Sequence, residues 1–481
     1  MSYIKGEDRR QIALFAESIE ALVEQDNPVR AIEAFVMALD MGKLGFTKAQ
    51  PVGIGRHPYD PRDLLKLYIY GYLNGIRSSR KLEAEAGRNI ELMWLLRRLK
   101  PDFKTIADFR KDNRDALINV FRQFNAMCKE WGLYSETLIA VDGSKFRANN
   151  SKKNNLNPKK IKRHIEYLDK QIEEYMTSLE QEDKKESKLT VPDAEEIKRR
   201  IAQYQERKQN YETMLEEMQA NKIEEISLID PDARKMATNN NGLDVCYNVQ
   251  TAVDAKHSLV VDCNVINNPT DHGHLTIMGK RARRFMGLKN RRLKVLADKG
   301  YHSTNDLVKC DKRKLTVYVP KPKRVSQHAP EFQLDKFEYD KKENVYYCPA
   351  GQTLYPTKKT RIINNVEYQD YKNNQVCKAC EQRENCTKNQ NGRTISRNCN
   401  QELLDKIERR TKKNKQLYRQ RQLIVEHPFG TVKRQWGFYY FLTRGLQAVT
   451  TEASLMFLVY NLKRVINILG VKKMREKLAA I

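Results

Sequence analysis

The sequence has no long apolar run. No stretch approaches the roughly 18 uninterrupted apolar residues at which a segment becomes a candidate transmembrane helix. The N-terminal residues MSYIKGEDRRQIALFAESIE carry charges where a signal peptide would need its apolar segment. We therefore expect neither a membrane span nor export, and we predict a cytoplasmic protein.

Cysteine is scarce, with nine residues in a chain of 481. A chain of this length can form two or three domains with ample buried core, so disulfides are not needed for stability. Cys128, Cys246, Cys263 and Cys310 are scattered through helix-like or strand-like segments, and we interpret them as reduced core thiols.

Acidic residues are outnumbered, at 61 Asp and Glu against 88 Lys and Arg, which gives a formal net charge of +27. A surplus of this size indicates a polyanionic partner, usually nucleic acid and less often an anionic membrane surface. With no membrane segment expected, the charge favours a cytoplasmic, nucleoid-associated protein.

Helical periodicity dominates residues 1–135, which predicts an all-α N-terminal DNA-binding domain. Its tract GIRSSRKLEAEAG suits a helix-turn-helix-like DNA contact, with a solvated charged face as the alternative. Residues 156–227 contain two heptad-patterned helices, such as the series Ile161, Ile165, Leu168, and predict an antiparallel coiled-coil hairpin insertion. The hairpin is either a passive spacer or an arm that touches DNA or mediates dimerisation.

Between and after these helices the sequence predicts a mixed sheet. ETLIAVDGSKF is typical of a buried strand with Asp142 at its C-terminal tip, and DVCYNVQTAVD and HSLVVDCNVIN alternate as a hairpin. A helix, the strand RLKVLADKGY, a short helix and the strand KLTVYVP follow. Three strands, helix, strand, helix, strand is the order of an α/β, RNase H-like five-stranded sheet flanked by helices.

Three acidic residues occupy neighbouring places in that fold: Asp142 on the first strand, Asp298 at the end of the fourth, and Glu426 on the helix after the last. Clustered carboxylates suit Mg²⁺, which prefers hard oxygen ligands and supports in-line displacement at phosphorus. The alternatives are an Asp-Gly turn for Asp142, a cap or turn ahead of Gly300 for Asp298, and a solvated helical residue for Glu426. Six nearby acidic residues are not assigned to the site: Asp230, Asp232, Asp244, Asp254, Asp262 and Asp271. Asp254 and Asp262 belong to the predicted β-hairpin, where turn or edge roles are favoured over catalysis.

Several strings resemble the DDE transposases of bacterial insertion sequences: AVDGSKF, DPDARKM, YNVQTAVD, ADKGYHS and VEHPFGTVKRQWGFYYFLTRGL. Residues 51–113 resemble the helical N-terminal domain that many of these enzymes carry. The resemblance implies that Asp142, Asp298 and Glu426 hold Mg²⁺ or Mn²⁺, cut the ends of the element and join the 3′ hydroxyls to target DNA.

The family's Tyr, Arg, Glu, Lys signature falls on Tyr418, Arg421, Glu426 and Lys433. Glu426 and Lys433 have the expected six intervening residues, but Arg421 and Glu426 have four where the usual pattern has three, which leaves Arg419 as a rival.

DNA contacts are also expected just after this signature. Lys433 and Arg434 suit phosphate contacts. Trp436, with Phe438, Tyr439 and Tyr440, could stack on an unpaired or flipped base or could instead pack the helix onto the sheet.

A second group of cysteines lies in residues 321–404, a predicted small β-rich insertion. Cys348, Cys377, Cys380 and Cys386 include a Cys-x-x-Cys pair and fit a tetrahedral structural Zn²⁺ site. The alternatives are a reduced thiol cluster or disulfides formed on isolation.

The sequence thus predicts an RNase H-like catalytic core from residues 136–155, 228–320 and 405–470, interrupted by the two insertions. By resemblance, the protein is expected to be a cut-and-paste DNA transposase that acts on terminal inverted repeats and target DNA, with at least two copies on the DNA. A nuclease or domesticated recombinase without strand transfer, and a catalytically silent DNA-binding regulator, are the alternatives.

Overall fold

The structure, a computed structural model, describes residues 18–49, 58–150, 154–183, 191–220, 223–238, 242–322 and 329–481. Residues 51–57, where the predicted family-like helical segment begins, lie outside the described residues, as do residues 184–190 between the two predicted coiled-coil helices.

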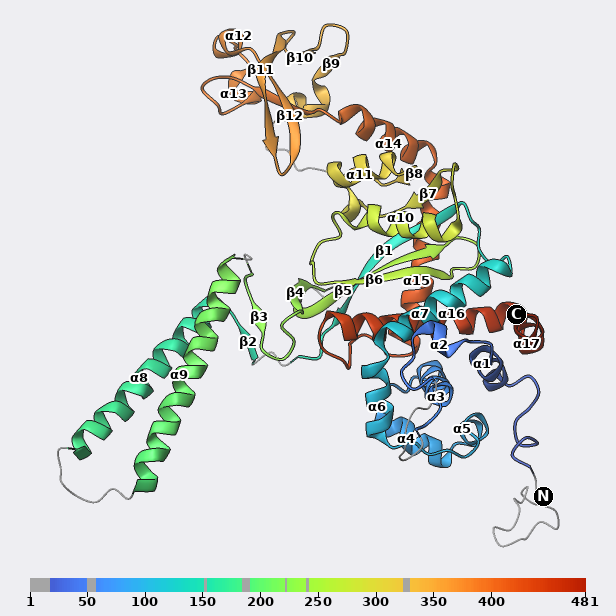
Figure 1. Cartoon of the computed structure of the whole chain (residues 1–481). Helices are drawn as coiled ribbons and strands as arrows, with labels where there is room; N and C mark the ends of the chain where they lie inside the picture. Colours follow the sequence, from blue (N-terminus) through green and yellow to red (C-terminus); the bar gives the residue numbers. More distant parts are fainter. Residues whose placement is uncertain are drawn as a thin grey trace, which may run out of the picture.

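The centre of the molecule is a six-stranded mixed sheet (Figure 1). β5 runs antiparallel to both β1 and β6, whereas β7 runs parallel to both β1 and β8. The order β6-β5-β1-β7-β8 is that of the RNase H-like sheet, so the predicted fold class is confirmed. The strands are β1 (Leu138–Arg147), β4 (Arg234–Ala237), β5 (Leu243–Asp254), β6 (Val260–Ile266), β7 (Leu293–Leu296) and β8 (Leu315–Tyr318).

The sixth strand, β4, corrects the expected number of five. It pairs only with the first four residues of β5, Leu243–Cys246, beyond the main body of the sheet. Its sequence, Arg-Lys-Met-Ala, is too short and too basic to show the alternation from which strands are predicted.

Helices cover the sheet. α10 packs on β5 and β6, α15 packs on β1 and β5, and α16 packs on β6. α15 contains Pro428 and passes into a π-helical turn, η5. Of the helices in the described ranges, none is alone long and apolar enough to cross a bilayer, although α16 and α17, bent by 106°, qualify as a pair. The helices are α10 (His274–Met286), α11 (Thr304–Lys312), α14 (Gln401–Lys413), α15 (Lys415–Phe429), η5 (Gly430–Gln435), α16 (Leu446–Leu469) and α17 (Val471–Ala479), with a short η2 (Lys299–Tyr301) after β7.

The N-terminal segment is helical, as predicted, and it shares one hydrophobic core with the sheet. α16 connects the two because it packs against α3, α7 and β6. Arg77, in the tract expected to contact DNA, instead points inward: it is buried, and its Nη1 lies 3.0 Å from Oε1 of the fully buried Glu452 on α16. The helices are α1 (Pro28–Met37), α2 (Met41–Leu44), α3 (Pro61–Leu73), α4 (Ser79–Arg88), α5 (Ile90–Leu95), α6 (Phe103–Asp112) and α7 (Arg114–Glu130).

A helical hairpin of α8 (Pro158–Asp183) and α9 (Val191–Ala220) projects from the sheet region (Figure 1). β2 (Asn155–Leu156) pairs with β3 (Ile226–Ser227) at its base. Lys208, the residue that interrupts the apolar heptad series, pairs with Asp169 across the hairpin at 2.5 Å. The predicted hairpin insertion is therefore confirmed.

A separate lobe, residues 329–400, extends from the end of the molecule opposite the N-terminal helices (Figure 1). We call it the Cys lobe. It contains a five-stranded sheet in the order β13-β12-β11-β10-β9, which confirms the predicted β-rich insertion. Its elements are η3 (Pro330–Phe332), η4 (Leu334–Lys336), β9 (Glu338–Asp340), β10 (Val345–Tyr347), β11 (Thr353–Ile363), β12 (Val366–Lys372), α12 (Asn374–Lys378), α13 (Arg383–Cys386) and β13 (Thr394–Asn398).

Candidate active site

The register of two parallel strands brings Asp142 and Asp298 to the same place. Ala140 of β1 is opposite Leu296, the last residue of β7. Asp142 and Asp298 each come two residues after that pair. Side chains at equivalent positions beyond a parallel pair lie next to each other, at the edge where the ligands of α/β sheets bind. We call these two residues the acidic pair.

The sequence suggested that Asp142 lies at the tip of its strand, but the structure places it inside the strand. β1 continues through Gly143 to Arg147, because the long strand β5 supplies partners as far as Cys246. The Asp-Gly dipeptide is therefore part of a strand and not a turn. Asp142 still marks the end of the parallel pairing, since β7 leaves β1 at Ala140.

Asp298 adopts the cap geometry that was the alternative to a catalytic role. Its Oδ1 accepts a hydrogen bond of 2.7 Å from the backbone N–H of Gly300, at the start of η2. A Cβ at Gly300 would lie 2.9 Å from that same Oδ1. The tight turn therefore holds the Asp298 carboxylate in place, and one oxygen of the group is used to do so.

The two carboxylates influence each other electrostatically. Burial raises the pKa of Asp142 to about 6; the negative charges of Asp298 and Asp271 contribute to this rise, and the positive charge of Arg421 opposes it. The side chain of Asp142 is 26% exposed. A carboxylate that loses water and gains acidic neighbours is destabilised in its charged form unless a cation lies close to it.

Arg421 on α15 supplies one such positive charge, with Nη1 3.5 Å from Oδ2 of Asp142. Tyr418, one turn earlier on the helix, hydrogen-bonds with Arg421 and lies within reach of the charges of Asp142 and Asp298; its own pKa is raised by burial. The rival Arg419 is exposed. Of the two arginines, the structure thus places Arg421 beside the acidic pair.

Glu426 is not brought into contact with the acidic pair. It is exposed on α15, and its Oε1 accepts a hydrogen bond of 2.8 Å from Gln422. Among the residues that the structure describes, no three Asp, Glu, His or Cys side chains are arranged so that they could hold a metal ion. The structure thus unites two of the three predicted acids and leaves the third on the neighbouring helix.

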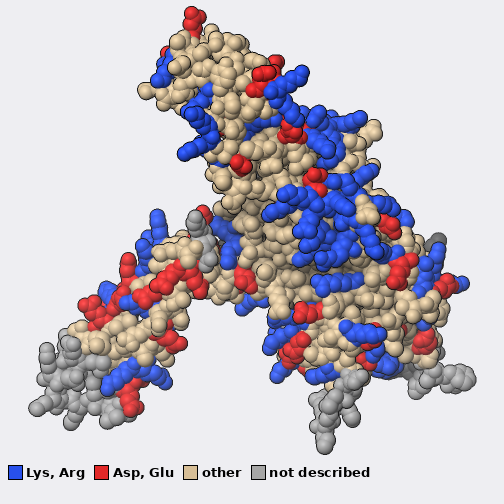
Figure 2. All heavy atoms as spheres, turned by 45° about the horizontal axis from the view of Figure 1, so that its top comes forward, with Lys and Arg blue, Asp and Glu red and all other residues tan. Residues whose placement is uncertain are grey.

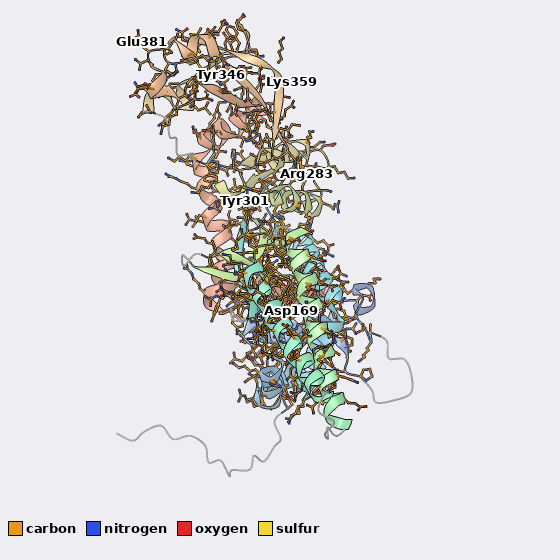
Figure 3. The ribbon with its side chains drawn as sticks, turned by 90° about the vertical axis from the view of Figure 1, so that its left-hand side faces the viewer. Asp169, Arg283, Tyr301, Tyr346, Lys359 and Glu381 are labelled. Atoms are coloured by element: carbon orange, nitrogen blue, oxygen red, sulfur yellow. The ribbon has the colours of Figure 1, made fainter. Side chains whose placement is uncertain are left out.

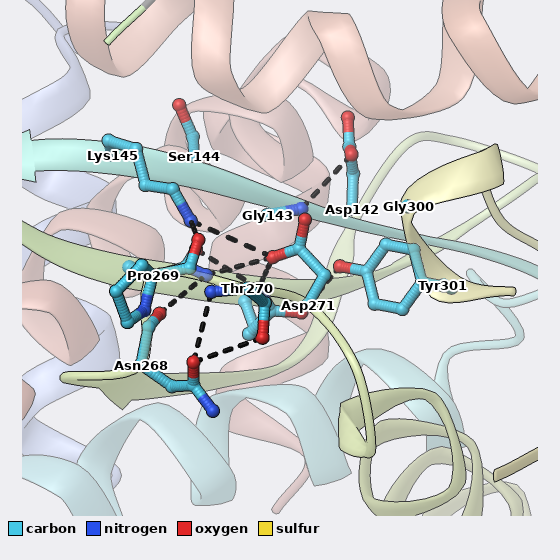
Figure 4. Close-up of polar contacts among 12 residues, drawn as sticks. Asp142, Gly143, Ser144, Lys145, Asn268, Pro269, Thr270, Asp271, Gly300 and Tyr301 are labelled. Carbon is cyan, nitrogen blue, oxygen red and sulfur yellow. Dashed lines mark hydrogen bonds and ion pairs between the residues drawn. The ribbon is translucent and has the colours of Figure 1, made fainter. Parts of the chain in front are cut away.

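Asp271, which the sequence analysis set aside, is the acid that joins this site. Its Oδ1 accepts hydrogen bonds from Gln250 at 2.7 Å and from Asn248 at 2.8 Å. Nζ of Lys145 lies 3.8 Å from the same oxygen (Figure 4). Asp271 lies on the opposite side of β1 from the Asp142 side chain (Figure 4). Asp271 therefore binds the buried amides of β5 and lies near Lys145 of β1, on the face of the sheet opposite the Asp142 side chain.

Two fully buried polar residues of β5 could have revealed Asp271 from sequence. Asn248 and Gln250 alternate on one face of a strand that is otherwise apolar at its centre. Buried amides require hydrogen-bond partners, so a pair of them predicts a polar group packed above. Tyr301 completes the network by donating its hydroxyl hydrogen to Oε1 of Gln250.

Next to the acidic pair, one edge of β1 opens into a groove. β7 pairs with β1 only as far as Ala140, and the segment around Tyr440 pairs with it at Arg147. The intervening stretch borders a cavity of about 500 Å³ that we call the edge groove. Its lining combines cations with an aromatic side chain: Gly143, Ser144, Lys145, Arg147, Ala237, Thr238, Asp271, Lys433 and Tyr439.

The predicted DNA-binding residues after Glu426 divide into structural and exposed groups. Lys433 donates to Oγ of Ser144 at 2.6 Å and to the carbonyl of Lys145 at 2.5 Å, and burial lowers its pKa to about 8. Trp436 is half-buried and packs against the core, with Nζ of Lys463 over its ring. Arg434 is exposed.

The aromatic residues that follow divide in the same way. Phe438 is buried, whereas Tyr439 and Tyr440 are 52% and 37% exposed. These two tyrosines, not Trp436, present the exposed rings of this cluster.

The residues at the acidic pair fit a divalent cation. The carboxylates of Asp142 and Asp298 are hard oxygen donors, which Mg²⁺ and Mn²⁺ prefer, and a nearby cation would offset the cost of charging the buried Asp142. The predicted zinc ligands lie elsewhere, in the Cys lobe.

Two family models match the chain. One, described as "Transposase domain (DUF772)", matches residues 17–112, which contain α1 to α6. The other, described as "Transposase DDE domain", matches residues 347–466, which contain Glu426 and Lys433 but neither member of the acidic pair.

No curated protein matches the chain. A similar solved structure is the "Cryo-EM structure of piggyBac transposase synaptic complex with hairpin DNA", with 8% identity, 95% of this chain and 80% of that chain covered, and a TM-score of 0.31.

Proposed function

Because the chain belongs to the DDE transposases of the insertion-sequence type, we propose that it cuts DNA at the ends of a mobile element and joins them to target DNA at the acidic pair. The observation that carries this proposal is the register of β1 and β7, which sets Asp142 beside Asp298 at the edge of the sheet.

Asp142 and Asp298 would hold a divalent cation, Mg²⁺ or Mn²⁺, and Glu426 is the proposed third ligand from α15. When bound, such an ion activates the attacking oxygen and stabilises the leaving oxygen in a displacement at phosphorus. Arg421 neutralises Asp142, and Tyr418 holds Arg421 in position. Asp271 would steady the sheet from the other face, through the buried amides of β5 and Lys145 of β1.

The edge groove is proposed to bind the DNA strand that reacts. Lys145 and Arg147 lie along it and suit phosphate oxygens, and the exposed ring of Tyr439 suits stacking on an unpaired base. Lys and Arg side chains also gather densely over the central part of the molecule, between the Cys lobe and the N-terminal helices (Figure 2). A net charge of +27 supports binding of the duplex beyond the reacting strand.

The partners would be double-stranded DNA, both terminal inverted repeats and target, with two copies of the chain on the DNA because two ends are processed together. The cellular location that follows is the bacterial nucleoid in the cytoplasm.

The deciding experiment uses DNA that carries the sequences flanking this reading frame, a target plasmid and Mg²⁺. A transposase releases the bounded segment and yields joined plasmid products, whereas a nuclease without strand transfer yields cleavage alone. Asp142→Asn and Asp298→Asn should abolish both products. Asp262→Asn, an acid of β6 that pairs with Arg281 instead, is the matched control and should retain them. Full activity in the Asp142→Asn protein would contradict the proposal, and the absence of both products with the unmodified chain would favour the DNA-binding regulator.

A further inference from the structure

Four cysteines of the Cys lobe meet at one small cavity. Its volume is about 20 Å³, close to the space that a single water molecule or ion requires. The cavity is lined by Phe332, Phe337, Cys348, Ala350, Gln352, Leu354, Cys377, Cys380, Arg383, Cys386, Thr387 and Arg393. All four cysteines are free thiols and are neither fully buried nor fully exposed.

The backbone around these cysteines forms two turns that present sulfur atoms to the cavity. In the first turn, the N–H of Gln352 donates to Sγ of Cys348 at 3.3 Å, and the N–H of Gly351 donates to the carbonyl of Cys348 at 2.9 Å. Backbone N–H groups that point at a sulfur stabilise its thiolate form and orient it as a ligand.

The second turn contains the Cys-x-x-Cys pair. Cys377 lies in α12, Cys380 follows the end of that helix, and Cys386 is the last residue of α13. Gly392, with φ +88°, passes so close that a Cβ there would lie 2.2 Å from Cβ of Cys377. The chain therefore closes tightly over this cysteine, and only glycine fits at the contact.

The Cys lobe has a small apolar core for its size. Its buried cluster consists of five residues: Phe337, Tyr346, Leu354, Tyr371 and Ile395. Three of the four cysteines pack against that cluster. Domains with so little buried apolar surface usually need a disulfide or a metal ion to stay folded.

We infer that the four thiols at this cavity bind one Zn²⁺ ion that stabilises the Cys lobe. Zinc favours four sulfur ligands in a tetrahedral arrangement. In this structure the thiols do not already form a group that could hold a metal, so binding would draw them inward by side-chain rotation, and each thiol would release its proton to solvent. The Arg393 guanidinium at the cavity would offset the negative charge of the resulting tetrathiolate site.

This site is separate from the proposed phosphoryl chemistry. Figure 3 shows Tyr346 and Glu381 in the Cys lobe, far along the molecule from Tyr301, which borders the acidic pair. The proposed zinc site can therefore be tested independently of the proposed function.

The test is the metal content of the full chain purified without chelators. We expect about one equivalent of zinc per chain, released when a mercurial reagent blocks the thiols and detected with a chromogenic chelator. Replacement by Co²⁺ should give the intense visible bands and sulfur-to-metal charge-transfer absorption of a tetrahedral thiolate site. Cys380→Ser should lose the zinc. Cys399→Ser is the matched control, because Cys399 is exposed in the same lobe and does not line the cavity, and it should retain the zinc.

The Co²⁺ spectrum of the unmodified chain keeps the test valid if Cys380→Ser fails to fold. Absence of zinc together with absence of Co²⁺-thiolate bands would overturn the inference. Zinc retained in a folded Cys380→Ser chain would also overturn it, as would mass-spectrometric detection of disulfides among these four cysteines in the freshly purified chain.

Discussion

Arg421 and Asp142 form an ion pair across two elements, with Nη1 of the arginine on α15 lying 3.5 Å from Oδ2 of the aspartate on β1. The residues are far apart in sequence, and their contact joins the helix that carries Glu426 to the strand that carries the first member of the acidic pair. It also shows which cation Asp142 relies on when no metal ion is bound.

The first prediction concerns that cation. Arg421 lowers the pKa of Asp142 against the effect of burial, so Arg421→Ala should raise that pKa above about 6 in the metal-free protein. Carbon-13 NMR titration of labelled aspartate, assigned with Asp142→Asn, would measure it. Arg419→Ala removes an equal charge from an exposed position of the same helix and should leave the titration unchanged. Equal shifts in both variants would show that the ion pair does not form in solution.

A second prediction follows from the raised pKa of Asp142 itself. The usual pKa of 3.8 applies to the unfolded chain, and the folded value is about 6, so the folded protein keeps a proton that the unfolded chain releases. Protonation of Asp142 costs the folded protein nothing below about pH 4, but ionising this buried carboxyl group lowers the free energy of unfolding progressively as the pH rises from about 4 to about 6. Asp142→Asn has no carboxyl group to titrate and should lack this loss.

The comparison of the two proteins isolates the effect, because all other groups titrate in both. In metal-free buffer at pH 7, Asp142→Asn should be more stable by about 1–3 kcal/mol, a range reduced for the partial exposure of the side chain. At pH 4 the difference should nearly vanish. Urea unfolding at both pH values measures it, and a variant that is less stable at pH 7 would refute the assigned burial cost.

A third prediction concerns Gly143. A Cβ at this position would lie 2.2 Å from Nε2 of Gln250 and 2.7 Å from Oδ1 of Asp271. Gly143→Ala should therefore displace the network that supports β1, with a loss of about 1–3 kcal/mol in stability and most of the DNA-processing activity. Gly87→Ala on α4 is the matched control, since a Cβ there meets nothing within 4 Å. It should raise stability slightly, and similar losses in both variants would mean that the contact at Gly143 is not specific.

A fourth prediction separates two neighbouring cations. Lys433 holds η5 against β1 through Ser144 and the carbonyl of Lys145, so Lys433→Ala should cost about 1–3 kcal/mol in the free energy of unfolding because it leaves partners unsatisfied. Arg434 is exposed, and Arg434→Ala should change stability by less than about 0.5 kcal/mol while it weakens DNA binding and reduces its salt dependence.

Chemical unfolding and DNA-binding isotherms at two salt concentrations measure both effects. The prediction fails if Arg434→Ala is the more destabilised protein, or if Lys433→Ala unfolds like the unmodified chain and loses only DNA affinity.

The sequence predicted those parts of the molecule that local pattern determines. Alternation and apolar runs identified the five main strands, and heptads identified the hairpin of α8 and α9. Asp298 could be placed because it follows a buried strand. Asp142 was assigned to the tip of its strand, and although β1 continues past it, Asp142 lies just beyond the parallel pairing of β1 with β7. The exact relation between Asp142 and Asp298 depends on register, which the strand patterns do not specify.

What the sequence did not predict depends on contacts between distant segments. Asp271 lies in a loop whose return path over β1 has no periodic signal, and Asp142-Gly143 resembles a turn because the length of β5 determines how far β1 continues. The inward orientation of Arg77 was missed for the same reason, since its partner Glu452 is on α16, 375 residues further along the chain.

Binding of Mn²⁺ to the acidic pair tests the account most directly. Electron paramagnetic resonance of free Mn²⁺ during titration should show a site in the unmodified chain that is lost in both Asp142→Asn and Asp298→Asn and kept in Asp262→Asn. If Asp142→Asn and Asp298→Asn bind Mn²⁺ as the unmodified chain does, the two aspartates do not form a shared cation site and the central claim is wrong.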